Sequence, residues 1–155
     1  MRRTATVVRL GRSETLPPAR QLRAAYGAVT VQRDERELIL SATERLLKAI
    51  VAENSLDSTQ VASALFSSTP DLTAASPAAA AVRIGWIFVP VFSFAEIQVA
   101  GGLSRCVKVL VHFTTDVRQD RIAHVFLDGA NTSHTSPVVR SRVHFKPRDN
   151  IIRSL

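Results

Sequence analysis

VAGGLSRCVKVLVHFTT (Val99–Thr115) is the part of the sequence from which an architecture can be worked out most directly. The Gly101-Gly102 pair indicates a tight turn, because glycine tolerates the backbone conformations that such turns need. The residues from Arg105 to Thr115 alternate in a way that predicts a β-strand, whose side chains point to opposite faces in turn. One face of this strand would carry Val107, Val109, Val111 and Phe113, and the other Cys106, Lys108, Leu110 and His112.

One strand and one long helix are predicted upstream of this stretch. The strand covers Leu22–Val31. Asp34 would cap the helix, with Glu37 three residues later completing a capping box. Asn54 is a plausible end of the helix. Its apolar residues recur with helical period and would form one buried stripe, made of Leu38, Ala42, Leu46, Ala49 and Ile50.

Shorter elements are predicted in the rest of the chain. Val61–Ser68 fits either a strand or a helix by periodicity alone. Pro77 suits the first position of a short helix over Ala78–Ile84. The apolar run Trp86–Val91 predicts a buried strand, and Ile122–Leu127 predicts a last strand. Together the elements predict an α+β fold, in which a mixed sheet of about five strands packs on helices on one face.

The length and the charge distribution bound the domain organisation. A chain of 155 residues with 46% hydrophobic content fits one domain with one core. We expect this domain at 21–130, between a basic extension at 1–20 and a basic segment at 131–155. Of the net charge of +7, six arginines against one glutamate lie in residues 1–23, and five basic residues against one aspartate lie in 140–155. The folded middle is slightly acidic, which argues against nucleic acid as a partner.

Several classes of protein are excluded by what the sequence lacks. No apolar run reaches the ~18 residues of a membrane span, and no apolar stretch follows the N-terminal arginines as in a secretory signal. The single Cys106 excludes an internal disulfide and fits a reducing, cytoplasmic location. The four histidines lack metal-ligand spacing, and Gly101-Gly102 lacks the context of a phosphate loop. We therefore predict no metal, no cofactor and no membrane partner.

Five short words occur along the chain in one order. They are YGAVTVQRD (Tyr26–Asp34), TPDL (Thr69–Leu72), GW followed by a proline (Gly85–Pro90), VAGGLSRC (Val99–Cys106) and TDVRQD leading into HVFL (Thr115–Leu127). In this order and spacing they resemble the AroH-class chorismate mutases over about residues 21–128. The resemblance implies a strand for Val61–Ser68 and the AroH-like chorismate mutase fold, a trimeric pseudo-α/β-barrel. It also implies sites at the subunit interfaces, where chorismate is rearranged to prephenate.

Such a rearrangement needs positioning and charge rather than a nucleophile. Fixed cations must hold two carboxylates and stabilise the ether oxygen on which negative charge builds up. The resemblance implies Glu96 and Lys108 as the catalytic residues, although the two equally fit a plain salt bridge at a subunit interface. The implied substrate-binding positions are Tyr26, Ser76, Arg83, Val91, Phe92, Ser93, Phe126 and Arg140.

Several of these positions depart from the family pattern. Tyr26 and Lys108 stand where the family carries arginine, Ala79 replaces a lysine, and Phe126 replaces a tyrosine. Lysine is a point charge and lacks the planar fork of arginine. The loss of one preorganised donor aimed at transition-state charge commonly costs about 3–4 kcal/mol. Phe92 adds bulk where the family has a small residue. We therefore expect the chain to be poor or inactive as a chorismate mutase.

We accordingly predict a diverged chorismate-mutase-like enzyme of isomerase or lyase type. Its pocket, at the interface of a homotrimer, would take a less charged small molecule through a pericyclic, isomerisation or dehydration step of a specialised biosynthetic pathway. Glu96 or Lys108 would handle a proton or stabilise an anion. Arg83 would bind a carboxylate of the substrate, or else be a solvated helix arginine. A weak genuine chorismate mutase and a non-catalytic ligand-binding or assembly trimer remain open as alternatives.

Overall fold

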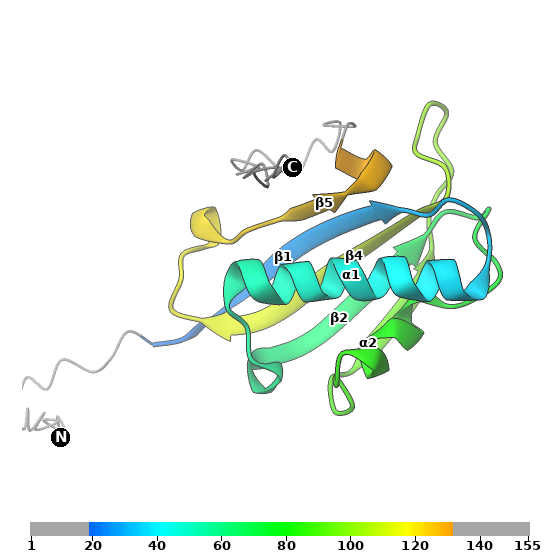
Figure 1. The fold of residues 1–155 in the computed structure, drawn as a ribbon. Helices are drawn as coiled ribbons and strands as arrows, with labels where there is room; N and C mark the ends of the chain where they lie inside the picture. Colours follow the sequence, from blue (N-terminus) through cyan, green and yellow to red (C-terminus); the bar gives the residue numbers. More distant parts are fainter. Residues whose placement is uncertain (1–18, 132–155) are drawn as a thin grey trace, which may run out of the picture.

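The computed structural model describes residues 19–131, which form one sheet covered by helices on one face (Figure 1). The strands lie in the order β3-β2-β4-β1-β5, and the strand predicted over Arg105–Thr115 is the central one. β4 is antiparallel to β1 and β2, whereas β3 runs parallel to β2 and β5 parallel to β1. The α+β class and the mixed five-stranded sheet are thus confirmed. The elements are β1 (Gln21–Thr30), α1 (Arg36–Asn54), β2 (Val61–Ser68), α2 (Ala80–Arg83), β3 (Val91–Ala95), β4 (Cys106–Thr115) and β5 (Val125–Leu127).

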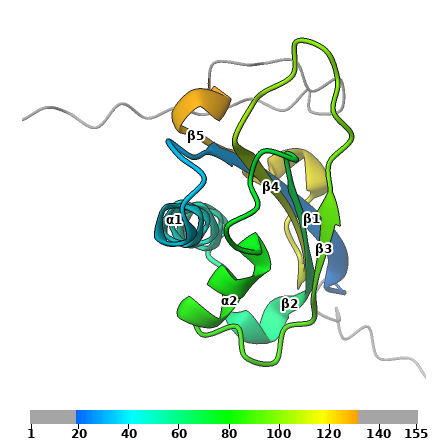
Figure 2. The same cartoon turned by 90° about the vertical axis from the view of Figure 1, so that its right-hand side faces the viewer.

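Both α-helices of the described part lie on the same side of the sheet (Figure 2). The core fills the space between them and the sheet, and Val107, Val109, Val111 and Phe113 of β4 belong to it, as their alternation predicts. We call the opposite side of the sheet the open face, because neither α-helix lies on it; in the described part a 3-10 turn, Asp128–Asn131, packs there through Ala130 against Ala28 and Cys106. Lys108, Leu110 and His112 of β4 are half-buried on this face.

The start of α1 differs from the expected capping box. Glu35 is the N-cap and makes no capping bond with its side chain. The carboxylate of Asp34 instead accepts hydrogen bonds from the backbone N–H groups of Thr73 and Ala74 and from the Thr73 hydroxyl, at 2.8–2.9 Å. The prediction of the cap was wrong because a distant loop supplies Asp34 with better partners than the helix does. The predicted end at Asn54 is confirmed.

The prediction of a strand over Trp86–Val91 was also wrong. Gly85 takes a positive φ of 84°, and the turn that follows buries Trp86 but leaves Phe88 96% exposed. The strand begins only at Val91, after Pro90, and forms an exposed edge of the sheet. The apolar run is therefore split between core, turn and edge, which periodicity could not reveal.

Two further elements are shorter than expected. The segment that Pro77 opens is a 3-10 turn, Pro77–Ala79, followed by the single α-helical turn of α2. β5 covers only Val125–Leu127, because a 3-10 turn over Gln119–Arg121 precedes it. The predicted basic ends and Arg140 lie outside the described residues. Within residues 19–131, no helix has both the length and the apolar character required to cross a membrane.

Candidate functional site

Register across the sheet places several predicted site residues side by side on the open face. Residues paired in register on neighbouring strands project to the same face. Lys108 lies in a row that crosses all five strands, and Tyr26 lies in the adjacent row. The first row is Phe94, Ser67, Lys108, Ala28 and Phe126, and the second is Phe92, Leu65, Leu110 and Tyr26.

Lys108 and Glu96 form an ion pair at one end of the open face. Glu96 follows β3 directly, and its backbone N–H donates to the carbonyl of Ser68 at 3.0 Å. The ammonium of Lys108 donates to one carboxylate oxygen of Glu96, and the hydroxyl of Ser67 lies 3.5 Å from the other. The two side chains are 30% and 21% exposed. The pair is therefore accessible but neutral as a whole.

Aromatic and neutral groups surround this pair. The rings of Tyr26 and Phe126 are 5.7 Å apart and tilted by 58°. Burial, followed by the charges of Cys106 and Glu96, raises the pKa of Tyr26 to about 12. Its hydroxyl thus stays protonated and can donate a hydrogen bond to a ligand. Burial also raises the pKa of Cys106 to about 11, so this buried thiol stays protonated at neutral pH.

His124 supports the strand that carries Tyr26. Its Nδ1 accepts a hydrogen bond from the backbone N–H of Tyr26 at 2.9 Å, and burial lowers its pKa. An accepting Nδ1 requires the neutral ring. These contacts give His124 a structural role, because they tie the segment before β5 to β1.

Three other candidate residues lie on the opposite side of β3. Val91 and Ser93 are in register with Ala64 and Phe66, which belong to the core face. The hydroxyl of Ser93 lies 3.1 Å from that of Ser76, and both residues are exposed. Within one chain, this group is therefore separated by the sheet from Lys108, Glu96 and Tyr26.

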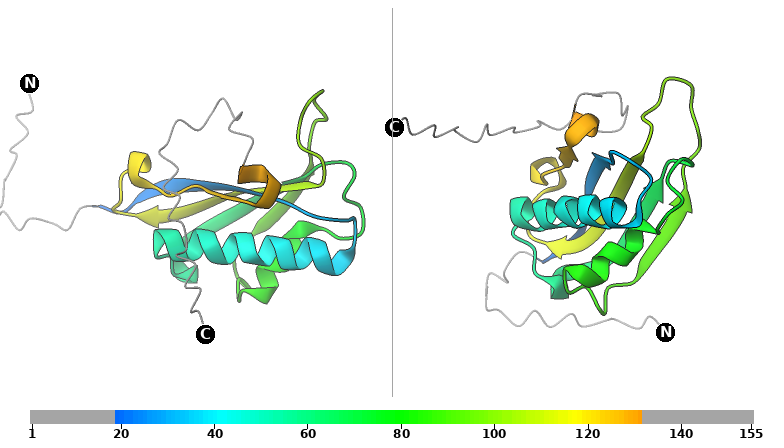
Figure 3. Two further views of the ribbon diagram at one scale, coloured as in Figure 1. Left: turned by 45° about the horizontal axis from the view of Figure 1, so that its top comes forward. Right: turned by 45° about the vertical axis from the view of Figure 1, so that its right-hand side comes forward.

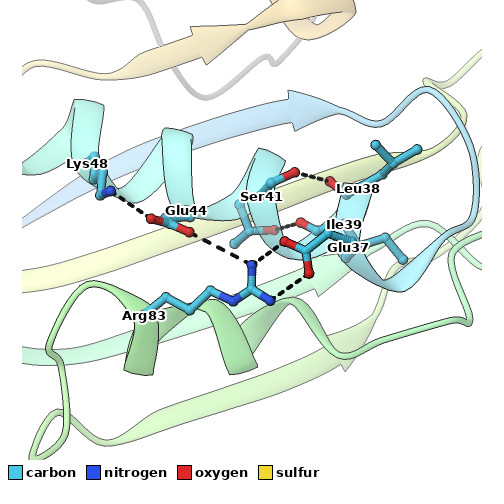
Figure 4. A network of polar contacts seen from close by, with 8 residues as sticks. Glu37, Leu38, Ile39, Ser41, Glu44, Lys48 and Arg83 are labelled. Atoms are coloured by element: carbon cyan, nitrogen blue, oxygen red, sulfur yellow. Dashed lines mark hydrogen bonds and ion pairs between the residues drawn. The ribbon is translucent and has the colours of Figure 1, made fainter.

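Arg83 is tied into the helical layer (Figure 4). Its guanidinium binds both carboxylate oxygens of Glu37, at 2.7 and 2.9 Å, and lies 3.9 Å from Glu44. The hydrogen bond from Arg83 lowers the pKa of Glu37. The structure thus does not bring Arg83 together with the open-face residues. In the single chain its guanidinium binds Glu37, so it is not free to bind a substrate carboxylate.

Sequence reasoning missed the polar residues that hold the Lys108–Glu96 pair. Ser67 contacts Glu96, and the side chains of Thr69 and Asp71 bind the start of β4. The word TPDL contains two of these residues, and we used it only for the resemblance. The strand alternation of Val61–Ser68 would have placed Ser67 beside Lys108.

The described residues also form a hollow away from the open face, but no metal site. Among residues 19–131, no group of three or more histidine, cysteine or acidic side chains could hold a metal ion. A hollow of about 610 Å³ lies on the helical side, between α1 and the loop that precedes β4. Arg45 lines it, but its guanidinium is paired with Asp128 at 2.7 Å.

Comparisons with known proteins show the family to which this fold belongs. The profile of the family described as chorismate mutase type I matches residues 22–135. The chain belongs to this family. Chorismate mutase AroH of Bacillus subtilis is 44% identical over 108 residues, which cover 69% of this chain and 85% of the relative. The AroH enzyme of Thermus thermophilus is 42% identical over 107 residues, covering 68% and 88%.

A solved chorismate mutase structure supports the same assignment. The enzyme from Clostridium thermocellum superimposes with a TM-score of 0.68 at 38% identity, covering 70% of this chain and 96% of that chain. The resemblance drawn from the five sequence words is therefore confirmed. As a type I chorismate mutase family member, the chain shares its α+β fold with these enzymes.

Proposed function

We propose that this chain is a diverged chorismate-mutase-type isomerase whose pocket takes a small carboxylate that carries less charge than chorismate. The observation that carries the proposal is the Lys108–Glu96 ion pair, since it leaves no uncompensated charge at that end of the open face. A dianion needs several cations that are not already neutralised. A single carboxylate needs only to compete with Glu96 for Lys108.

The lining of the pocket fits such a substrate. Phe126 and Phe92 offer apolar walls, and Tyr26 offers a neutral donor. Once a ligand carboxylate binds Lys108, Glu96 is free to accept a proton or to orient the substrate. An isomerisation or a dehydration could use this pair, and a pericyclic step needs only the positioning. A specialised biosynthetic pathway in the cytoplasm is part of the same proposal.

The pocket would be completed by a second protomer in a homotrimer. The candidate residues fall into two groups on opposite sides of the sheet: Lys108, Glu96 and Tyr26 on one side, and Val91, Ser93 and Ser76 on the other. A neighbouring subunit could place its own copy of the second group beside the first. The open face also leaves large apolar side chains uncovered, with Leu22 59%, Phe92 59% and Phe94 49% exposed. Exposed apolar patches of this kind commonly mark protein interfaces.

A weak genuine chorismate mutase is the second candidate function. It is favoured by the 44% and 42% identity to AroH enzymes over more than four fifths of their length. In this case Lys108 would stabilise the ether oxygen itself, as a less well-organised cation than arginine.

Chorismate consumption by the purified protein of verified oligomeric state separates the two candidates. We expect no turnover by the parent protein, and only slow turnover by Lys108→Arg. Turnover by the parent that Lys108→Met abolishes, while Phe94→Leu retains it, would establish the genuine mutase instead.

Binding of simple aromatic acids tests the charge preference directly. Benzoate carries one carboxylate and isophthalate carries two on the same ring. We expect NMR titration to show tighter binding of benzoate and its loss in Lys108→Met. Tighter binding of isophthalate would contradict the proposal. Absence of both binding and turnover would leave the non-catalytic trimer as the function.

A further inference from the structure

The segment Ser67–Asp71, which leads out of β2, contacts both halves of the Lys108–Glu96 pair. On the side of Glu96, the Ser68 carbonyl accepts the Glu96 backbone N–H at 3.0 Å, and the Ser67 hydroxyl approaches the Glu96 carboxylate. These contacts fix the point at which the chain leaves β3. They set the backbone position of Glu96 but not that of Lys108.

The same segment binds the start of β4, the strand that carries Lys108. The carboxylate oxygens of Asp71 accept the backbone N–H of Arg105 at 2.8 and 3.0 Å. The Thr69 hydroxyl donates to Asp71 and accepts the backbone N–H of Cys106 at 2.9 Å. The Thr69 backbone N–H donates to the Cys106 carbonyl at 3.0 Å. Asp71, Thr69 and the first residues of β4 thus form one connected network.

The backbone of Arg105 is strained where Asp71 binds it. Its φ of 46° is in the left-handed region, which is unfavourable for a non-glycine residue. An ionised Asp71 offers its N–H a charge-assisted bond that offsets this cost. Hydrogen bonds from Thr69 and from the Arg105 amide lower the pKa of Asp71, so the carboxylate is charged at neutral pH.

The register of β4 is set by its pairing with β1 and β2 and by its buried face, and it directs Lys108 to the open face. Asp71 and Thr69 act on the end of this strand. They hold Arg105 and Cys106, which lie three and two residues before Lys108, at the point where the long loop from β3 enters β4 (Figure 3). Without these bonds the end of β4 that carries Lys108 would be less firmly held.

We propose that Asp71 is a positioning residue for the Lys108–Glu96 pair, acting through Thr69 and the backbone amides that open β4. The relevance to catalysis rests on the proposed function, but the positioning does not. Asp34 provides a matched control, because it too is a loop carboxylate bound by a threonine hydroxyl and by backbone N–H groups, two of them against the one of Asp71. None of its partners belongs to β4 or adjoins Glu96.

The test measures how strongly Lys108 is held, without any substrate. The protein is treated with limiting acetic anhydride, and peptide mass spectrometry gives the acetylation rate of Lys108 relative to that of Lys48, which pairs with Glu44 on the surface of α1. In Asp71→Asn we expect the ratio to rise about tenfold, as the loss of about 1.4 kcal/mol of charge-assisted bonding would produce. In Asp34→Asn we expect no change.

A second pair of variants covers the case in which Asp71→Asn does not fold. Thr69→Ser keeps the hydroxyl and should keep the parent ratio, whereas Thr69→Val should raise it. Unchanged Lys108 reactivity in folded Asp71→Asn or Thr69→Val, or an equal rise in Asp34→Asn, would overturn the proposal. If a substrate is found, Asp71→Asn should raise KM, because Lys108 binds the substrate carboxylate in the proposed function, whereas Asp34→Asn should leave KM unchanged. Failure to find one leaves the acetylation result valid.

Discussion

At the scale of single residues, burial decides the protonation states around the open face. Tyr26 and Cys106 are kept neutral by raised pKa values of about 12 and about 11. Burial lowers the pKa of His124 and so favours its neutral form as well. Lys108 and Glu96 compensate each other's charge at one end of this face. The proposal of a ligand with little net charge rests on this balance.

His124 should make stability depend on pH near neutrality. Its folded-state pKa lies below the usual 6.5, so the unfolded chain binds the proton more readily. The stabilisation is complete above about pH 6.5 and is lost as the pH falls through 6.5 toward the folded-state value. We expect the urea midpoint to fall between about pH 7.5 and about pH 5.

The control is His124→Asn, whose amide oxygen can replace Nδ1 as the acceptor for the Tyr26 N–H but does not titrate. Its midpoint should change less over the same range, which lies above the pKa values of ordinary carboxylates. Parallel pH profiles of the two proteins would show that His124 does not cause the effect.

At the scale of elements, the contact between β1 and α1 depends on a missing side chain. A Cβ atom at Gly27 would lie 2.8 Å from Cδ1 of Ile50, 2.9 Å from Cδ1 of Leu46 and 3.2 Å from the Val125 carbonyl oxygen. The glycine lets α1 lie close enough to β1 for Leu46 and Ile50 to be fully buried. The helix thereby supports the strand that presents Tyr26 on the other face.

Gly27→Ala should therefore destabilise the fold by overpacking, by about 1–3 kcal/mol in urea denaturation. Ile50→Val removes the Cδ1 atom that the new methyl group would meet, and by itself should cost about 0.5–1.5 kcal/mol. The double variant should be more stable than the sum of the two changes predicts. Strict additivity would show that the helix moves away instead.

At the scale of the whole molecule, both α-helices of residues 19–131 lie on one face of the sheet (Figure 2). Sheets with one bare apolar face are stable when that face packs against something else. The proposed homotrimer would cover the open face and bring the two groups of candidate residues together. Leu110 lies in the middle of this face, in register with Tyr26 and Leu65.

Leu110→Lys should break the assembly, because it would bury three unpaired charges at the interfaces. Sedimentation analysis should give three times the chain mass of 16.9 kDa for the parent and a monomer for the variant. Val82→Lys is the matched control, since Val82 is 66% exposed on α2, on the other side of the sheet. A monomeric parent, or an unaffected variant, would refute this interface.

Strand alternation, the long helix and the five sequence words are local features, and they were enough to predict the fold class, the face shared by Val107, Val109, Val111 and Phe113, and the family. They also predicted that Lys108 and Glu96 belong together. These predictions succeeded because period and composition reflect which side of an element is buried.

Tertiary structure alone decided where the polar groups find their partners. Asp34 bonds a loop 39 residues away rather than its own helix, Arg83 is held by Glu37, and the apolar run after Gly85 divides between core and edge. Hydrogen bonds and ion pairs join residues that are distant in sequence, and their energies depend on geometry that no periodic pattern records. The sequence by itself therefore determined the fold and the family of this protein, and only the folded chain decided which charges remain available to a ligand.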